Sequence, residues 1–203
     1  DNKKKDLKLK KFVPASGAAS RMFKFLLEFL NDFNVEEETF NAYINRKKDA
    51  SMAVFLAGLE KYPFYEQVDE LLKKKYSNYN FWSKDVKDYY FIKTLLSARC
   101  LNFAAKPKGV LPFHKYNDNH IATPVEEHLN ECAFYSSSKE SAYLHFTISE
   151  EHLNAFQEII EAVKDNVEKQ SGISIEVNFS YQNKATDTIA VDANNNPFRE
   201  ENG

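Results

Sequence analysis

The chain has 203 residues, of which 43% are hydrophobic, and a formal net charge of −3. Without an excess of basic residues, it lacks the charge pattern that binds nucleic acid or an anionic membrane surface. Its two cysteines cannot form a disulfide framework, and no apolar run is long enough to cross a membrane. We therefore expect a cytoplasmic protein whose residues 1–203 form a single domain or a fragment of one.

The first predicted elements are a strand, a loop and a helix. Residues 11–13 predict a short buried strand that ends at Pro14. Small residues follow over 15–20, and the apolar spacing over 21–30 predicts a helix. This order of elements is typical of a phosphate-binding site.

A large helical insertion is predicted over about residues 31–98, where apolar residues recur with a helical period. Amphipathic helices are expected over residues 49–59 and 63–75, and Ser83 is suited to cap a third helix.

Strands and helices alternate in the remainder of the chain. Residues 107–116 are expected to be a loop, and Pro124 to begin a helix. The residues predicted to form strands are 143–148, 173–181 and, as a short further strand, 188–191. A helix is expected over residues 149–169, with Gly172 just past its end. This alternation predicts an α/β fold. The turn-rich residues 195–203 suggest a piece of a longer protein.

The loop over residues 14–22 is the first candidate site. Its small residues leave backbone N–H groups open to a polyphosphate, Ser20 can cap the following helix, and Arg21 can clamp phosphate oxygens. The candidate binding residues of this loop are Ala15, Ser16, Gly17, Ala18 and Ser20. By itself the pattern also fits a tight turn of small residues packed against a helix.

The segment over residues 106–113 is the second candidate site. Gly109 and two prolines, Pro107 and Pro112, would hold the loop rigidly and give Lys108 a set direction. A lysine held in this way can serve as a charge partner for an α-phosphate. The alternative is an ordinary proline-rich surface turn.

Together these two segments resemble the sugar-nucleotide pyrophosphorylases, a nucleotidyltransferase superfamily. Residues 15–22 match its Gly/Ala-rich loop that ends in Thr/Ser-Arg-Met/Leu, and residues 107–112 match its Pro-Lys-x-x-x-Pro segment. Residues 179–185 resemble the Phe-x-x-Gln segment of UDP-sugar pyrophosphorylases, which places Gln182 near the nucleotide. The resemblance implies a partial glycosyltransferase-A-like nucleotidyltransferase fold, with a Rossmann-like sheet and the helical insertion. It assigns catalytic phosphate contacts to Arg21 and Lys108.

A closer resemblance, over nearly the whole chain, is to the N-terminal part of an uncharacterised bacterial domain family, carried by residues 12–22 and 182–192. Against the superfamily pattern, Ser16 and Ala19 stand where glycine is usual. The superfamily's Gly-His-Gly-like segment and acidic metal ligand do not occur before Gly203. The resemblance implies Mg²⁺ as a cofactor, and its ligand is expected outside this chain.

The implied function is binding of a nucleoside triphosphate and a sugar-phosphate-type substrate, with release of pyrophosphate. One alternative is a catalytically inactive nucleotide-binding module, and another is an interaction domain formed by the helical region. The sequence defines neither the base, the sugar nor the oligomeric state.

Other titratable residues carry weaker signals. His128 and Cys132 lie four residues apart on a predicted helix, but the further ligands of a zinc site are missing, so no metal site is predicted. Asp187 and Asp192, near a turn, are expected to be structural rather than Mg²⁺ ligands.

Overall fold

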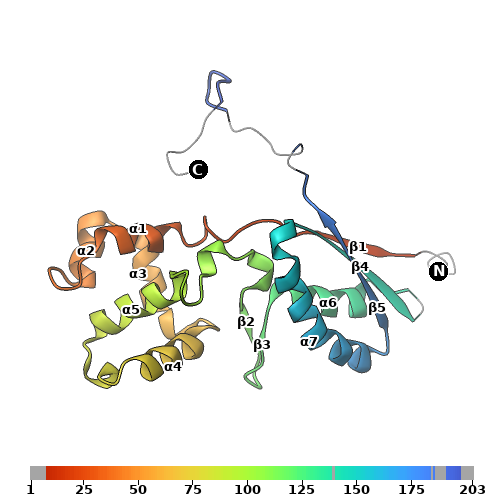
Figure 1. Ribbon diagram of the computed structural model, residues 1–203, viewed down its shortest axis with the longest axis horizontal. Helices are drawn as coiled ribbons and strands as arrows, with labels where there is room; N and C mark the ends of the chain where they lie inside the picture. The colour runs from red at the N-terminus through yellow and green to blue at the C-terminus, as the bar shows by residue number, and fades with distance from the viewer. Residues whose placement is uncertain (1–7, 139, 184, 186–190, 198–203) are drawn as a thin grey trace.

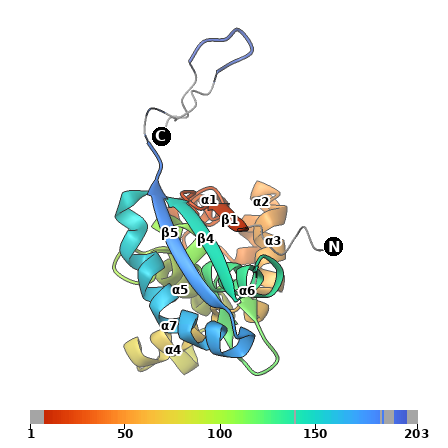
Figure 2. The same ribbon diagram turned by 90° about the vertical axis from the view of Figure 1, so that its right-hand side faces the viewer.

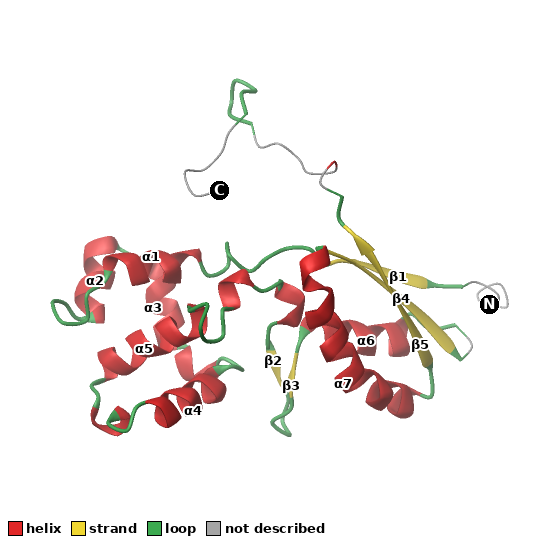
Figure 3. Cartoon of the chain, viewed as in Figure 1, coloured by secondary structure: helices red, strands yellow, loops and turns green. Residues whose placement is uncertain are grey.

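The computed structural model of the protein describes residues 8–138, 140–183, 185 and 191–197. A three-stranded parallel sheet lies at one end and a group of helices at the other (Figure 1). Figure 3 shows that these helices are separate from the strands along the length of the molecule. The predicted α/β class is confirmed, whereas the nucleotidyltransferase fold stays a prediction.

The sheet consists of β1 (Lys10–Pro14), β4 (Ser141–Ile148) and β5 (Ser174–Tyr181), in the order β1-β4-β5. Both neighbouring pairs are parallel, and β4 and β5 run side by side in Figure 2. All three strands lie where the apolar patterns predict them. Because parallel strands end at the same edge, the segments that follow them leave the sheet together, which is where α/β sheets bind ligands.

Two helices, α6 (Pro124–Tyr135) and α7 (Leu153–Ser171), cover one face of the sheet (Figure 1). Pro124 begins α6 as predicted, because a missing N–H costs nothing in the first turn. Gly172 ends α7 with a φ of 68°, a left-handed conformation that glycine adopts readily. Buried and half-buried residues alternate along β4, and the buried set packs in the helix-covered core: Ala142, Leu144, Phe146 and Ile148.

Five α-helices form the second group: α1 (Lys24–Asp32), α2 (Phe40–Lys47), α3 (Ala50–Ala57), α4 (Tyr65–Lys75) and α5 (Lys84–Leu96). They lie in the region where the sequence predicts helices. Asp49 caps α3, accepting a bond of 2.9 Å from the Met52 N–H, and Ser83 caps α5 as predicted. Their core is aromatic, because the Phe29 ring lies 4.6–5.0 Å from three other rings.

Some local elements differ from the expectations. Residues 107–116 are more than a loop, because they contain the 3₁₀ turn η5 (Lys108–Val110) and the strand β2 (His114–Lys115), which pairs with β3 (Ile121–Ala122). The helix expected from residue 149 begins as the 3₁₀ turn η6 (Glu150–His152). The remaining 3₁₀ turns are η2 (Leu59–Lys61), η3 (Tyr79–Phe81) and η4 (Phe103–Ala105).

The helix expected from Arg21 begins at Lys24 instead. The N–H groups of Met22 and Phe23 both donate to the Ala19 carbonyl, at 2.9 and 3.2 Å, so the intervening residues form turns. The strand expected over residues 188–191 and Asp187 lie outside the described residues, except for Val191, which bridges to Pro197. None of the helices in the described part of the chain is both long and apolar enough to span a bilayer.

Candidate functional site

The two motif loops pair with each other at the carboxyl edge of the sheet. The Ala19 N–H donates to the Lys106 carbonyl at 3.0 Å, and the Lys108 N–H donates to the Gly17 carbonyl at 3.1 Å. Pairing of this kind sets the position at which the lysine side chain leaves the backbone. The structure thus brings the two sequence motifs into one site.

Three consecutive N–H groups of the first loop, those of Ser16, Gly17 and Ala18, have no hydrogen-bond acceptor among the described residues. The prediction of open N–H groups is wrong for Ala15 and Ala19. Ala15 donates to a carbonyl of β4 at 2.7 Å, and Ala19 is bound to the second loop. These two bonds anchor the loop at both ends and leave the middle free to meet an anion.

A cavity of about 220 Å³ lies between the two loops and α6. Its wall includes Ala15 and Gly17 of the first loop, Lys108 and Gly109 of the second, and His128 of α6. Lys108 is exposed, and its ammonium group has no ion-pair partner within the described ranges. Of the three residues with unbonded N–H groups, Gly17 lines the cavity together with this cation, which is the combination that a phosphate site requires.

His128 was not predicted in this cavity, and only its position on the helix after the lysine loop could have indicated it. Its Nδ1 lies 3.3 Å from a carboxylate oxygen of Glu131. Burial, aided by the charge of Lys11, lowers the pKa of His128, so the imidazole is neutral near pH 7. A neutral imidazole in the cavity wall can donate or accept one hydrogen bond to a ligand.

Cys132 does not join His128 in a metal site. Its side chain is buried, and burial raises the pKa of its thiol. In the part of the chain that is described, no group of three or more His, Cys, Asp or Glu side chains is arranged to hold a metal ion. Asp192 instead accepts hydrogen bonds from Asn194 and Asn196 within its own turn.

The two motif glycines have different roles. A Cβ placed on Gly109 would lie 2.9 Å from Cζ of Phe156, so this glycine allows the lysine loop to pack closely against α7. A Cβ on Gly17 would meet no atom within 4 Å. Gly109 is therefore needed for packing, whereas Gly17 leaves space beside the unbonded N–H groups.

The cavity wall does not include the other predicted site residues: Ser16, Ala18, Ser20, Arg21 and Gln182. Arg21 and Ser20 are exposed in the turns before α1. Ser20 does not cap this helix, because the N-cap position is Phe23, three residues later. Gln182 is exposed where β5 ends, and its N–H donates to the Ile148 carbonyl at 3.0 Å. The strand order places it two strands from β1, roughly 10 Å away.

A cluster in which rings of the β2–β3 hairpin meet carboxylates of α6 was also not predicted. His114 Nδ1 and the Tyr116 hydroxyl lie 2.9 and 2.6 Å from Glu127 Oε1, and His120 Nε2 lies 2.7 Å from Glu126 Oε1. The hydrogen bond to Glu127 raises the pKa of Tyr116 to about 12. The spacing of two between His114 and Tyr116, which puts side chains on one side of an extended segment, was the available signal. The hairpin thus engages both carboxylates of the first turn of α6.

Comparison with curated proteins and with solved structures found no match. A family model with the description "Domain of unknown function (DUF4301)" matches residues 1–203. The predicted membership of an uncharacterised domain family is confirmed, and the resemblance to sugar-nucleotide pyrophosphorylases stays a prediction. The chain belongs to the DUF4301 family of domains of unknown function.

Proposed function

We propose that the paired loops bind the phosphates of a nucleoside triphosphate and that the domain is nucleotidyltransferase-like. The supporting observation is that the N–H groups of Ser16, Gly17 and Ala18 have no acceptor among the described residues. Gly17 lines the cavity together with Lys108, which has no ion-pair partner in the same part of the chain. N–H groups and lysine are common partners of phosphate oxygens, and the carboxyl edge of a parallel sheet is a common place for them. Both cysteines are free, in keeping with a cytoplasmic location.

In the proposed reaction, a phosphate oxygen of a sugar-phosphate-type substrate bonds to the α-phosphorus of the nucleotide, and pyrophosphate leaves. The free N–H groups position the phosphates, and Lys108 neutralises charge that develops on them. Catalysis of phosphoryl and nucleotidyl transfer depends mainly on such positioning and neutralisation. We assign Arg21 and Gln182 to the parts of the ligands that extend beyond the cavity.

Mg²⁺ commonly accompanies nucleoside triphosphates in this chemistry. The wall of the cavity contains no carboxylate, so the described residues do not form a magnesium site of their own. We therefore include Mg²⁺ only as an ion that the triphosphate brings with it, and assign no step to it.

A second candidate is a nucleotide-binding module without turnover. Ala19, which stands where the superfamily usually has glycine, is fully buried within the core of the helical part. Its N–H group is also bound to the second loop. At this position the residue holds the two loops together rather than touching a phosphate, which favours binding over catalysis.

Titration calorimetry with the magnesium complexes of nucleoside triphosphates tests the proposal. We expect the wild-type chain to bind one of them, and Lys108→Ala and Gly17→Ala to bind at least about tenfold more weakly. Lys106→Ala is the matched control on the same loop, because the Lys106 ammonium lies 5.6 Å from the centre of the Phe103 ring and Lys106 does not line the cavity.

Absence of binding by the wild-type chain at millimolar nucleotide would refute the proposal. A pyrophosphate-release assay then separates the two candidates. Release that requires a sugar phosphate and is lost in Lys108→Ala identifies an enzyme, whereas binding without release identifies the inactive module.

A further inference from the structure

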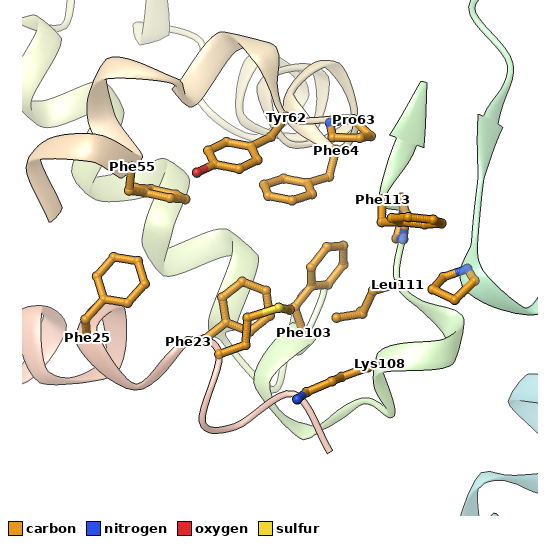
Figure 4. A pocket seen from close by; sticks show the side chains of 13 residues that line it. Phe23, Phe25, Phe55, Tyr62, Pro63, Phe64, Phe103, Lys108, Leu111 and Phe113 are labelled. Carbon is orange, nitrogen blue, oxygen red and sulfur yellow. The ribbon is translucent and has the colours of Figure 1, made fainter. Parts of the chain in front are cut away.

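A second cavity, of about 390 Å³, lies between the helical part and the lysine loop (Figure 4). Aromatic rings that contact one another in succession form much of its wall. The rings are, in order of contact, Phe25, Phe55, Tyr62, Phe64, Phe103 and Phe23. The centroids of successive rings are 5.2–6.3 Å apart.

The packing of these rings keeps the cavity open. Phe55, Phe64 and Phe103 are each less than 8% exposed and belong to the core of the helical part. None of them can turn into the cavity without leaving its neighbours, because aromatic contacts and close packing hold each ring. The volume lies in the range of small-molecule sites, roughly 300–1,000 Å³.

The mouth of the cavity is lined by apolar side chains and by one positively charged side chain, that of Lys108. Met22 is 47% exposed and Phe113 is 54% exposed, although both line the cavity. Of the described residues in the wall, Lys108 alone carries a charge, and Figure 4 shows its side chain at the edge of the cavity, away from Tyr62 and Phe64. A deep apolar wall with one cation at its edge is complementary to an amphipathic anion.

We propose that this cavity binds the aromatic or acyl group of a small anion, whose acidic group pairs with Lys108. The inference goes beyond the proposed function, because it requires only the aromatic wall and the lysine and not a nucleotide. Lys108 borders both cavities, so the acidic group of this ligand lies where the two cavities meet.

The test is a fluorescence titration of the full chain with 8-anilinonaphthalene-1-sulfonate, an aromatic anion. We expect one saturable site, about fivefold weaker binding in Lys108→Ala, and about tenfold weaker binding in Met22→Glu, which places a carboxylate at the mouth. Lys108→Arg and Met22→Leu, which keep the charge and the apolar mouth, should bind as the wild type does.

Phe81→Ser is the control for dye adsorption, since Phe81 is 90% exposed and does not line the cavity. It should leave binding unchanged. Decanoate should displace the dye about fivefold more effectively than decanol, because only the acid pairs with Lys108. Thermal unfolding of each variant separates loss of the site from loss of the fold.

Three results would overturn the proposal: many weak dye sites, a loss of binding in Phe81→Ser but not in Met22→Glu, or equal displacement by decanoate and decanol. Self-association on sedimentation that is abolished by Met22→Glu would also overturn it, by showing a second copy in the cavity. If nucleotide binds and the dye does not, only this inference fails. If the dye binds and nucleotide does not, only the proposed function fails.

Discussion

Replacing Gly109 with alanine adds a methyl group between the lysine loop and α7. The added Cβ would lie 2.9 Å from Cζ and 3.3 Å from Cε1 of Phe156, whereas carbon atoms attract best at roughly 3.5–4.0 Å. Phe156 is fully buried, and its ring packs against Phe146 at 5.4 Å, which blocks retreat on that side, although the ring also borders the cavity between the loops. The backbone of Gly109 is not in the left-handed region, so the effect is steric. Overpacking of this kind costs roughly 1–3 kcal/mol.

For a chain of this length, a loss of roughly 1–3 kcal/mol lowers Tm by about 2–12 °C, which thermal unfolding followed by circular dichroism will detect. In the double variant Gly109→Ala with Phe156→Leu, the loss in free energy of unfolding should be about 1 kcal/mol smaller than the sum of the losses in the two single variants, because leucine leaves room for the new methyl group. Gly17→Ala is the matched control and should keep the wild-type Tm, since its Cβ meets no atom. Additive effects, to within about 0.5 kcal/mol, would show that the reasoning from this contact is wrong.

Three further predictions concern single side chains. Asp49→Ala removes the cap of α3 and should lower the free energy of unfolding, measured in urea, by about 1 kcal/mol, whereas Asp49→Asn should stay close to the wild type. Equal losses in the two variants would contradict this. A thiol reagent at neutral pH should label the exposed Cys100 first and the buried Cys132, whose thiol pKa is raised, only on unfolding; two fast equivalents would contradict this. The N–H of Ile175 donates to Glu168 at 2.6 Å and lowers the pKa of Glu168, so the carboxylate stabilises the fold above the ordinary value of 4.5. The free energy of unfolding should therefore exceed that of Glu168→Gln at pH 7, and this difference should shrink as the pH falls below about 4.5; a constant difference would contradict it.

The sequence predicted the elements whose signals are local. Alternating residues along β4, Pro124 at the start of α6 and Gly172 at the end of α7 each act within a few residues, so no knowledge of the fold was needed. The predicted start of α1 was wrong because a contact distant in sequence determines it. Ala19 is held by a hydrogen bond to Lys106, far along the chain, and no local pattern reports such a bond.

The candidate site was predictable in its residue types but not in its geometry. Small residues at positions 15–20 and a lysine between prolines indicated two loops, and the sequence alone left each open to a structural explanation. The tertiary structure decided that these loops pair and that the N–H groups of Ala15 and Ala19 are used as anchors. It also decided that the three N–H groups between them meet no acceptor in the described part of the chain. Pairing decides which N–H groups remain for a ligand, because each donor has one hydrogen to give.

The aromatic cavity shows the same division. The chain contains 17 phenylalanines and 11 tyrosines, and this abundance by itself predicts a filled core. Whether the six rings of the cavity wall fill the space between them or leave a cavity depends on how α1 and α3 are placed relative to the lysine loop. A cavity is what remains after segments distant in sequence have packed, so its shape belongs to the tertiary structure alone.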